Sequence, residues 1–375
     1  MPAPIRGPGR DRFFEFLRVG LPLTLVVDAL AAVTHAAQQD AGRANANRFL
    51  VSDTLVLALV VVAGVPAAQV GYAYLVEALI RPLPEKTQWA LRPWLWLAPA
   101  LAFLGVFLIY PALNTLLLSL KDARSADFVG LQNYVFAFTN RTMLIAFRNN
   151  LLWLVFFTFF TVGFGLLMAV LTDRVRYEPL AKSVIFMPMA ISFVAASVIW
   201  KFVYEFRPEG VAQIGLLNAI LTSLIPEFQP VAWLVNQVVN NFALIMVAVW
   251  VWVGFCLVIL SAALKGIDPA LLEAARVDGA TEWQVFWWIM IPILSTTIIV
   301  VATTMVIFAL KAFDVVYVMT NGNFNTEVIA NRMYKEMFNF RHFGRASAIA
   351  VILFLATIPV MVANVRRFRG QEAVR

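Results

Sequence analysis

The chain has 375 residues, of which 61% are hydrophobic and only 14% are charged. A soluble domain could not bury so large an apolar fraction, so the composition indicates an integral membrane protein. The formal net charge is +7, but Lys and Arg are spread over short connections between apolar runs, which is typical of membrane topology and argues against a nucleic-acid partner.

Cysteine and histidine are too few for a disulfide framework or a metal centre. Cys256 lies inside an apolar run, and His35 and His342 are far apart in the sequence. We therefore expect no metal site and no cofactor bound by this chain.

Two apolar runs, 15–34 and 54–80, open the chain. The first follows a basic start without a prompt small-residue cleavage pattern, which favours a retained signal anchor. Asp28 and Glu77 interrupt these runs, and the sequence does not show what pairs with them. The Pro- and Arg-containing stretch 81–94 separates both runs from the rest of the chain.

A spanning helix needs about 20 mostly apolar residues. Six further runs qualify, at 93–119, 150–172, 180–203, 241–263, 291–313 and 346–365. The expected fold is all-α, a polytopic membrane protein with about eight transmembrane helices. It divides into an N-terminal segment, 1–92, with two extra helices, and a six-helix core domain, 93–375.

The short loops predict the orientation, because Lys and Arg concentrate on the cytoplasmic side. The basic groups are Arg6, Arg10, Arg12, Arg18, Arg81, Lys86, Arg92, Arg174, Arg176, Lys182, Arg366, Arg367 and Arg369. With eight spans they all fall on one side, so both termini and the connection 264–290 are expected in the cytoplasm. The longer connection 205–237 lies outside, where its short amphipathic helices could meet an extracytoplasmic partner.

The cytoplasmic stretch 268–294 carries helix start and stop signals in close succession. Asp268 followed by Pro269 predicts a helix start, because Asp accepts free backbone N–H groups and Pro has a preset φ. Gly279 predicts its end in a left-handed conformation. Thr281 with Gln284 fits a capping box, which starts a second helix that continues into the next span.

The first of these helices is expected to have two distinct faces. Leu271, Leu272 and Ala275 form an apolar stripe, while Glu273 and Arg276 lie three apart on another face, where they could form a solvated surface pair. Such a helix could enter a groove on a cytoplasmic partner.

This pattern resembles the EAA loop of importer-type ABC transporter permeases. The match is carried by Glu273, Ala274, Ala275, Gly279, Ile289 and Pro292, at the family's order and spacing. The resemblance implies that 264–292 is the coupling loop that docks into the ATP-hydrolysing subunit. By resemblance, the coupling residues are Glu273, Ala274, Ala275, Asp278, Gly279 and Pro292.

The resemblance extends over about 93–370 and implies the type I ABC importer permease fold. The stretches 128–138, 185–204 and 313–338 look like the larger permease of maltose-type or α-glucoside-type sugar importers. Two features differ. Sugar permeases commonly have Gly-Gly-Pro after the position of Thr320, where this chain has Asn-Gly-Asn, and the large outer insertion of the maltose type has no counterpart here. The missing insertion points away from the maltose type, and the overall length and the extra N-terminal spans resemble the α-glucoside type, which is therefore the most similar.

No lysine directly follows a glycine, so a Walker A loop is absent and the chain is not the ATPase. The resemblance implies partners: a second permease subunit, two nucleotide-binding ATPase subunits that use ATP and Mg²⁺, and an extracytoplasmic sugar-binding protein. In that assembly the chain would import an oligosaccharide, most similar to an α-glucoside such as maltose, trehalose or sucrose, across the inner membrane.

A sugar needs hydrogen-bonding groups and an aromatic face, and polar groups inside a membrane are costly unless they line a cavity. The candidates by depth and chemistry are Ser192, Ser197, Asn240, Asn241, Trp250, Trp252, Thr303 and Thr304. For each of them, ordinary helix packing is the competing interpretation, because Ser and Thr often bond to the preceding turn. Lys201, Lys311 and Asp314 are expected to reach the outer interface.

Two other classes of function compete with this one. An ion-coupled secondary transporter of a polar solute would also have many spans, but it would not need the coupling loop. A membrane enzyme is disfavoured, because the sequence has neither an H-E-x-x-H motif nor a serine-nucleophile elbow.

Overall fold

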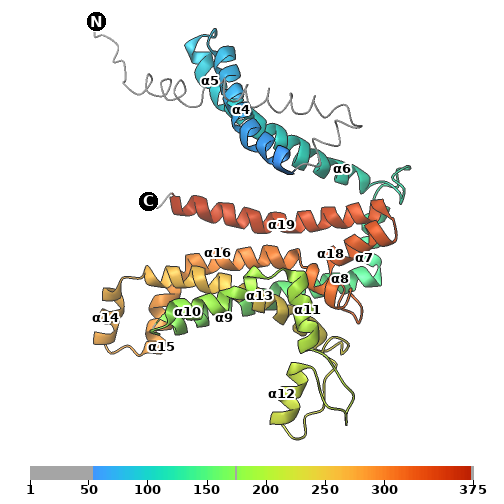
Figure 1. Ribbon diagram of the computed structural model, residues 1–375, viewed down its shortest axis with the longest axis vertical. Helices are drawn as coiled ribbons and strands as arrows, with labels where there is room; N and C mark the ends of the chain where they lie inside the picture. Colours follow the sequence, from blue (N-terminus) through green and yellow to red (C-terminus); the bar gives the residue numbers. More distant parts are fainter. Residues whose placement is uncertain (1–53, 174, 373–375) are drawn as a thin grey trace. The chain divides into compact units, whose positions relative to one another are not determined.

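The computed structural model describes residues 54–173 and 175–372 (Figure 1). Within these ranges the chain is helical without a β-strand, and one isolated antiparallel bridge joins Lys121 to Phe128. The all-α class expected from the sequence is confirmed. The expected first span, 15–34, and Asp28 lie outside the described residues.

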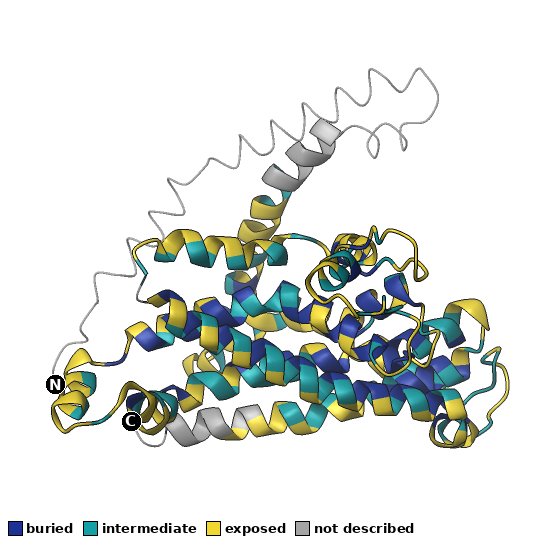
Figure 2. Cartoon of the chain, turned by 90° about the horizontal axis from the view of Figure 1, so that it is seen from below, coloured by how far each residue is buried: buried dark blue, intermediate teal, exposed yellow. Residues whose placement is uncertain are grey.

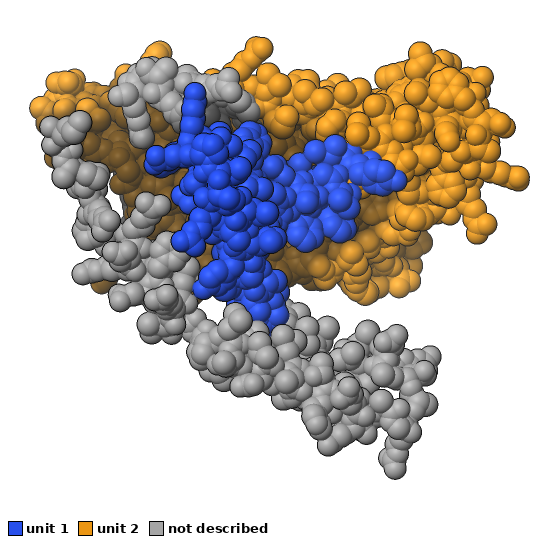
Figure 3. Space-filling view, turned by 90° about the horizontal axis from the view of Figure 1, so that it is seen from above, with its two compact units in different colours: residues 1–110 blue, residues 111–375 orange. Residues whose placement is uncertain are grey.

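The chain divides into two compact units, residues 1–110 and 111–375, coloured separately in Figure 3. Between residues 54 and 110, the described part of the first unit, the helices are α4 (Thr54–Ile80), α5 (Glu85–Leu104) and the π-helical turn η1 (Gly105–Ile109). Glu77 of α4 accepts from Arg92 of α5 at 3.0 Å, and the Tyr72 hydroxyl donates to the Leu95 carbonyl. These contacts supply the partner for Glu77 that the sequence leaves open.

The second unit is built from the remaining helices. In chain order these are α6 (Tyr110–Leu118), α7 (Gln132–Thr139), α8 (Arg141–Leu152), η2 (Trp153–Phe157), α9 (Thr158–Asp173), α10 (Glu178–Phe186), η3 (Met187–Ala190), α11 (Phe193–Val203), α12 (Leu216–Leu224), α13 (Asn240–Lys265), α14 (Pro269–Val277), α15 (Glu282–Val285), η4 (Phe286–Met290), α16 (Ile291–Leu310), α17 (Asp314–Met319), α18 (Ile329–Tyr334), η5 (Lys335–Asn339) and α19 (Phe343–Glu372).

Six helical stretches among the described residues are long and apolar enough to cross a membrane. They are Ala63–Ile80, Glu85–Leu118, Arg141–Asp173, Asn240–Lys265, Glu282–Leu310 and Phe343–Ala363. The pair Glu178–Ala190 and Phe193–Val203 makes a seventh span only if its two bent pieces are counted together. Each of these seven stretches overlaps one of the seven expected spans that begin with 54–80 and end with 346–365.

The stretch 180–203, expected as one spanning helix, is in fact two helices that meet at 103°. Pro188 lies in the 3₁₀ turn that ends the first piece, where its missing N–H does no harm. Ser192 then has extended backbone angles, and its Oγ accepts from the Ala195 N–H at 3.2 Å. The break is therefore capped, which makes it a defined bend.

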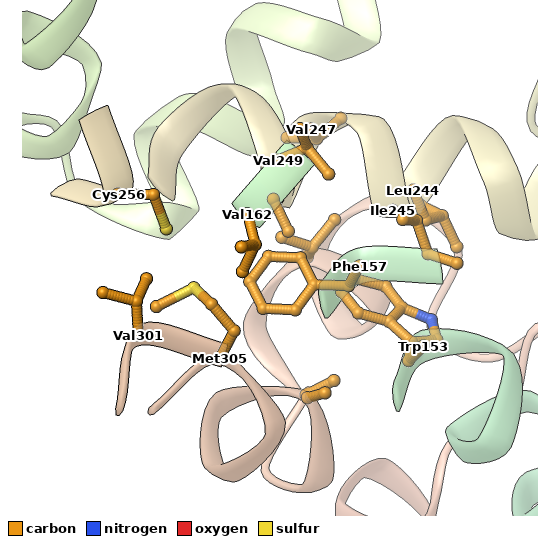
Figure 4. Close-up of a cluster of buried hydrophobic side chains, with 14 of the residues drawn as sticks. Trp153, Phe157, Val162, Leu244, Ile245, Val247, Val249, Cys256, Val301 and Met305 are labelled. Atoms are coloured by element: carbon orange, nitrogen blue, oxygen red, sulfur yellow. The ribbon is translucent and has the colours of Figure 1, made fainter. Parts of the chain in front are cut away.

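Helix α13 is the centre of the second unit, with 61% of its spanning window buried. Figure 2 shows buried residues running along the inner helices, and Figure 4 shows side chains from η2, α9, α13 and α16 gathered in one apolar cluster. Glycines let the backbones approach: a Cβ added at Gly254 would lie 2.5 Å from the Phe186 Cα, and one at Gly165 would lie 3.1 Å from the Leu257 nitrogen. Such small residues are the usual means of close helix packing in membranes.

The two ends of the second unit carry different connections. Helices α14 and α15 lie at one end, and α7, α18 and the excursion that contains α12 lie at the other (Figure 1). Buried Asn218 holds the excursion together: its Nδ2 donates to the Glu205 and Val231 carbonyls, and its Oδ1 accepts from the Val231 N–H and the Trp233 Nε1. A short helix expected within 205–237 is thus present as α12.

Candidate functional site

The start of helix α14 has the expected cap. The Asp268 carboxylate accepts from the Ala270 N–H at 2.9 Å, and Pro269 is the first helical residue. Because the Asp side chain satisfies one of the free N–H groups at the helix start, the chain can begin this helix directly after the long span α13.

The end of α14 is a Schellman motif centred on Gly279. The Gly279 N–H donates to the Arg276 carbonyl at 3.0 Å, and the Ala280 N–H donates to the Ala275 carbonyl at 3.0 Å. Gly279 has φ +87°, and a Cβ added there would have open space around it. The backbone conformation alone, and not crowding, therefore requires glycine.

The second helix begins with the expected capping box. Thr281 Oγ1 accepts from the Gln284 N–H at 3.3 Å, and Gln284 Oε1 accepts from the Thr281 N–H at 2.8 Å. The helix runs through η4 into α16, with Pro292 in its first turn. The segment α14 to α15 is therefore helix, sharp turn and helix.

On the exposed surface of α14, Arg276 has a different ion-pair partner from the one expected. Arg276 bonds to Glu282 of α15, with Nε to Oε1 at 2.7 Å, and so does not form the pair with Glu273 that the sequence suggests. The hydrogen bond to Glu282 raises the pKa of Arg276. This contact ties the two short helices together across the turn.

The expected apolar stripe of α14 is divided between two surroundings. Leu272 packs against the main apolar cluster and Ala275 is half-buried, whereas Leu271 is exposed. Val277, outside the expected stripe, is 87% exposed. Glu273 and Ala274 also face outward. The helix is thus anchored by one side and presents a mixed apolar and acidic side for contact with another protein.

A cavity of about 230 Å³ lies between η2, α11, α13, α16 and α17. Its walls are mainly aromatic: Trp153, Phe157, Phe193, Trp252, Phe308 and Phe313. The ring centroids of Trp252 and Phe308 are 3.9 Å apart, and those of Trp252 and Phe193 are 6.4 Å apart. Aromatic faces of this kind can stack against the apolar face of a ligand ring.

Four residues of the cavity wall also carry polar groups. The indole N–H groups of Trp153 and Trp252 are buried and have no hydrogen-bond partner among the described residues. Lys311 and Asp314 line the same space and are exposed at its edge. A buried donor without a partner is costly, so a ligand oxygen that accepts from these indoles would be stabilised there.

Of the candidate substrate residues, Trp252 is the one that lines this cavity. Three hydroxyls instead bond to the preceding helical turn: Ser197 to the Phe193 carbonyl, Thr303 to that of Ile299, and Thr304 to that of Val300. Ser192 caps α11, and Trp250 packs edge-on against Trp200 at 5.8 Å. For these side chains the packing interpretation accounts for the contacts observed.

The two asparagines at the start of α13 lie next to the loop 320–328. Asn240 Nδ2 donates to the Phe324 carbonyl at 2.8 Å, and the buried Asn241 side chain donates to Asn240. Asn149 Nδ2 also donates to this loop, at the Asn325 and Glu327 carbonyls. Asn240 therefore helps to hold the loop.

That loop is where the sequence departs from the Gly-Gly-Pro pattern of sugar permeases. Asn321, Gly322, Phe324 and Asn325 all have positive φ values, between 50° and 73°. A Cβ at Gly322 would lie 2.8 Å from the Asn331 Nδ2, so this position needs glycine for two reasons. The loop 320–328 is thus tightly wound.

Trp153 and Phe308 line the cavity although the sequence does not indicate it, and Lys311 and Asp314, expected at the outer interface, line it as well. Trp153 lies in an expected span where any aromatic residue could be packing, and only the fold brings it across from α13. One local signal was available: Lys311 and Asp314 flank Phe313 directly after a span. Among the described residues, no cluster of three His, Cys, Asp or Glu side chains could hold a metal ion.

Comparison with known proteins places the chain in a family. Residues 161–367 match the family described as the binding-protein-dependent transport system inner membrane component. The osmoprotective compounds uptake permease protein GgtC of Synechocystis sp. is 63% identical over 281 residues, covering 75% of this chain and 100% of that protein. The alpha-glucoside transport system permease protein AglF of Rhizobium meliloti is 47% identical over 278 residues, covering 74% and 82%.

A solved chain has the same fold at lower identity. It comes from a bacterial ABC transporter involved in the import of the acidic polysaccharide alginate, with a TM-score of 0.63 and 23% identity over 76% of this chain and 96% of that one. At this identity the likeness concerns the fold alone. The family match and the two relatives show that the chain belongs to the family of inner membrane components of binding-protein-dependent transport systems, as a permease subunit of an ABC transporter and not an enzyme.

Proposed function

We propose that this permease subunit carries a small, uncharged α-glucoside, such as maltose, trehalose or sucrose, into the cell. The observation that carries the proposal is the aromatic cavity, since two of its wall residues, Trp153 and Trp252, have a buried indole N–H without a partner among the described residues. Sugar sites combine aromatic faces with a few placed polar groups. The 47% identity to an alpha-glucoside permease supports the same substrate class.

The charges and size of the cavity narrow the substrate. Lys311 and Asp314 carry opposite charges, so the cavity wall has no net charge to select an acidic sugar. A volume of about 230 Å³ is below the ~300–1,000 Å³ of ordinary drug-sized sites. Both features favour a neutral sugar of one or two rings. The cavity would hold only part of such a sugar at a time.

The energy for transport would come from other subunits. The expected assembly holds a second permease subunit, two ATPase subunits that use ATP and Mg²⁺, and an extracytoplasmic sugar-binding protein. In it, α14 docks on an ATPase subunit through the exposed side that includes Leu271, Glu273 and Val277. Asp278, Gly279 and Pro292 would hold the docking helix at its angle to α16.

The membrane arrangement follows from the same assignment. The domain from residue 93 onward would form the permease core in the inner membrane, with 1–92 adding two helices. Both chain termini and the α14 to α15 loop would face the cytoplasm, and the α12 excursion would face the binding protein. An ion-coupled secondary transporter is the competing function, but it would have no need for a capped docking loop.

Uptake of labelled sugars into proteoliposomes tests the cavity. The complex would be assembled with its binding protein and offered maltose, trehalose, sucrose and an acidic oligosaccharide. We expect uptake of a neutral sugar only, and a loss of about 5-fold or more in Trp252→Ala, since a stacking face and a donor together are worth ~1–3 kcal/mol.

Two variants make this test specific. Trp252→Phe keeps a ring but removes the N–H, so an intermediate loss is expected. Trp89→Ala alters a tryptophan that is 73% exposed in the first unit and should leave uptake unchanged. Native uptake in Trp252→Ala would contradict a role for the cavity in sugar binding.

A further inference from the structure

A three-membered charge cluster joins the start of α10 to the end of α13. Glu178 Oε1 accepts from Lys265 Nζ at 2.6 Å and also from Lys182 Nζ. Lys182 in turn donates to the Ser261 hydroxyl of α13. The Glu178 and Lys182 side chains are 19% and 16% exposed, so water and salt screen this pair less than an open surface pair, whereas the Lys265 side chain that reaches Glu178 from α13 is 55% exposed.

The other end of α10 is also fixed to α13. At Gly254 the two backbones approach so closely that an added Cβ would lie 2.5 Å from the Phe186 Cα and 2.7 Å from the Ile185 oxygen. Helix α10 is therefore held to α13 at both of its ends, by charge at Glu178 and by backbone packing at Phe186. We expect the two helices to move as one body.

The charged end of this body lies next to the docking loop. Lys265 is the last residue of α13, and Asp268, which caps α14, follows three positions later. A displacement of α14 must therefore reach Lys265 through a very short connection. The Lys265 contact then passes the displacement to Glu178 and α10.

The packed end of this body lies next to the sugar cavity. After α10 and the turn η3, the chain bends by 103° at the break capped by Ser192. The next residue, Phe193, lines the cavity and faces Trp252 at 6.4 Å between ring centroids. Rotation at this break would move Phe193 relative to Trp252 without unwinding either helix.

We propose that Glu178 is a positioning residue that makes α10 a lever between the α14 loop and the cavity wall. The cluster of Glu178, Lys182 and Lys265 transmits the movement of α14 to α10, and the bend at Ser192 converts it into a movement of Phe193. This inference rests on the proposed function, because it assumes that α14 is driven by an ATPase subunit.

The test measures coupling in the reconstituted complex with its binding protein and a panel of maltose, trehalose and sucrose. For each variant we would record ATP hydrolysis with and without sugar, and the number of ATP molecules hydrolysed for each sugar taken up. Glu178→Gln and Lys265→Met should keep assembly and unstimulated hydrolysis, but the sugar stimulation should fall at least three-fold and the ATP cost of each sugar should rise.

A charge swap separates transmission from simple stability. Glu178→Lys combined with Lys265→Glu restores opposite charges at the contact between positions 178 and 265, so stimulation should recover to at least half of the native value. Glu77→Gln is the matched control, since it removes one partner of an ion pair in the first unit and should not change coupling.

The proposed role of Glu178 would be overturned if Glu178→Gln kept the native sugar stimulation of ATP hydrolysis. It would also be overturned if the charge-swapped double variant showed no more stimulation than Lys265→Met alone. Failure of the proposed function looks different, because the native complex itself would then show no sugar-stimulated hydrolysis. In that case none of the sugars would stimulate ATP hydrolysis even in the native complex, whatever the variants show.

Discussion

Gly279 is the residue on which the shape of the turn between α14 and α15 depends most directly. Its φ of +87° reverses the chain between α14 and α15, and the two Schellman hydrogen bonds form only in that conformation. The surroundings leave room for a side chain, so substitutions at this position separate conformational cost from steric cost.

Gly279→Ala should lower sugar-stimulated ATP hydrolysis, because the left-handed conformation costs a residue with a Cβ ~1–2 kcal/mol. Gly279→Asn is the control, since Asn tolerates this conformation and the space around the position is open. The measurement is stimulation of the reconstituted complex, and equal activity of the Ala and native forms would show that the turn conformation does not matter for coupling.

Helices show the clearest division between what the sequence predicts and what it cannot. The caps at Asp268 and Thr281 and the stop at Gly279 were predictable because each depends on neighbours within a few residues. The bend in 180–203 was not predicted, although Pro188 and Ser192 lie in it, because a proline in a membrane helix often leaves the helix continuous. Contacts between distant helices, such as Glu178 with Lys265, carry no local signal.

Which residues line the cavity also depends on how the helices pack, and not on the residue types alone. Trp252 was selected by its depth and chemistry, but the hydroxyls chosen by the same criteria bond to their own helices. Trp153 and Phe308 become wall residues only because η2 and α16 pack against α13. The sequence therefore predicts which kinds of residue can line such a cavity, but not which helix faces meet.

Gly254→Ala should destabilise the second unit by ~1–3 kcal/mol, because the new methyl group would push α10 away from α13. Gly163→Ala in α9 is the matched control, since an added Cβ there meets nothing within 4 Å. Thermal unfolding of the purified protein in detergent measures both. Equal unfolding temperatures for Gly254→Ala and Gly163→Ala would contradict the close backbone contact between α10 and α13.

At the scale of the whole molecule, the two ends of the second unit should lie on opposite sides of the membrane. Val277 of α14 is 87% exposed, and Val238, just before α13, is 77% exposed at the other end. Single cysteines at these positions, in a Cys256→Ser background, would report their side by reaction with a membrane-impermeant maleimide.

In cells with an accessible outer face we expect labelling of Val238→Cys and protection of Val277→Cys, since basic loops remain in the cytoplasm. Breaking the cells should expose the second cysteine to the reagent. The reverse pattern would place α14 outside, where no ATPase subunit could reach it.

The energy source of transport tests the central claim most directly. Proteoliposomes that contain the assembled complex would be loaded with Mg²⁺ and ATP and given labelled sugar with its binding protein, with and without an ion gradient. We predict that accumulation requires ATP and the binding protein and is unchanged when ionophores collapse every gradient. Accumulation that follows an ion gradient in the absence of ATP would contradict the account and identify the chain as a secondary transporter.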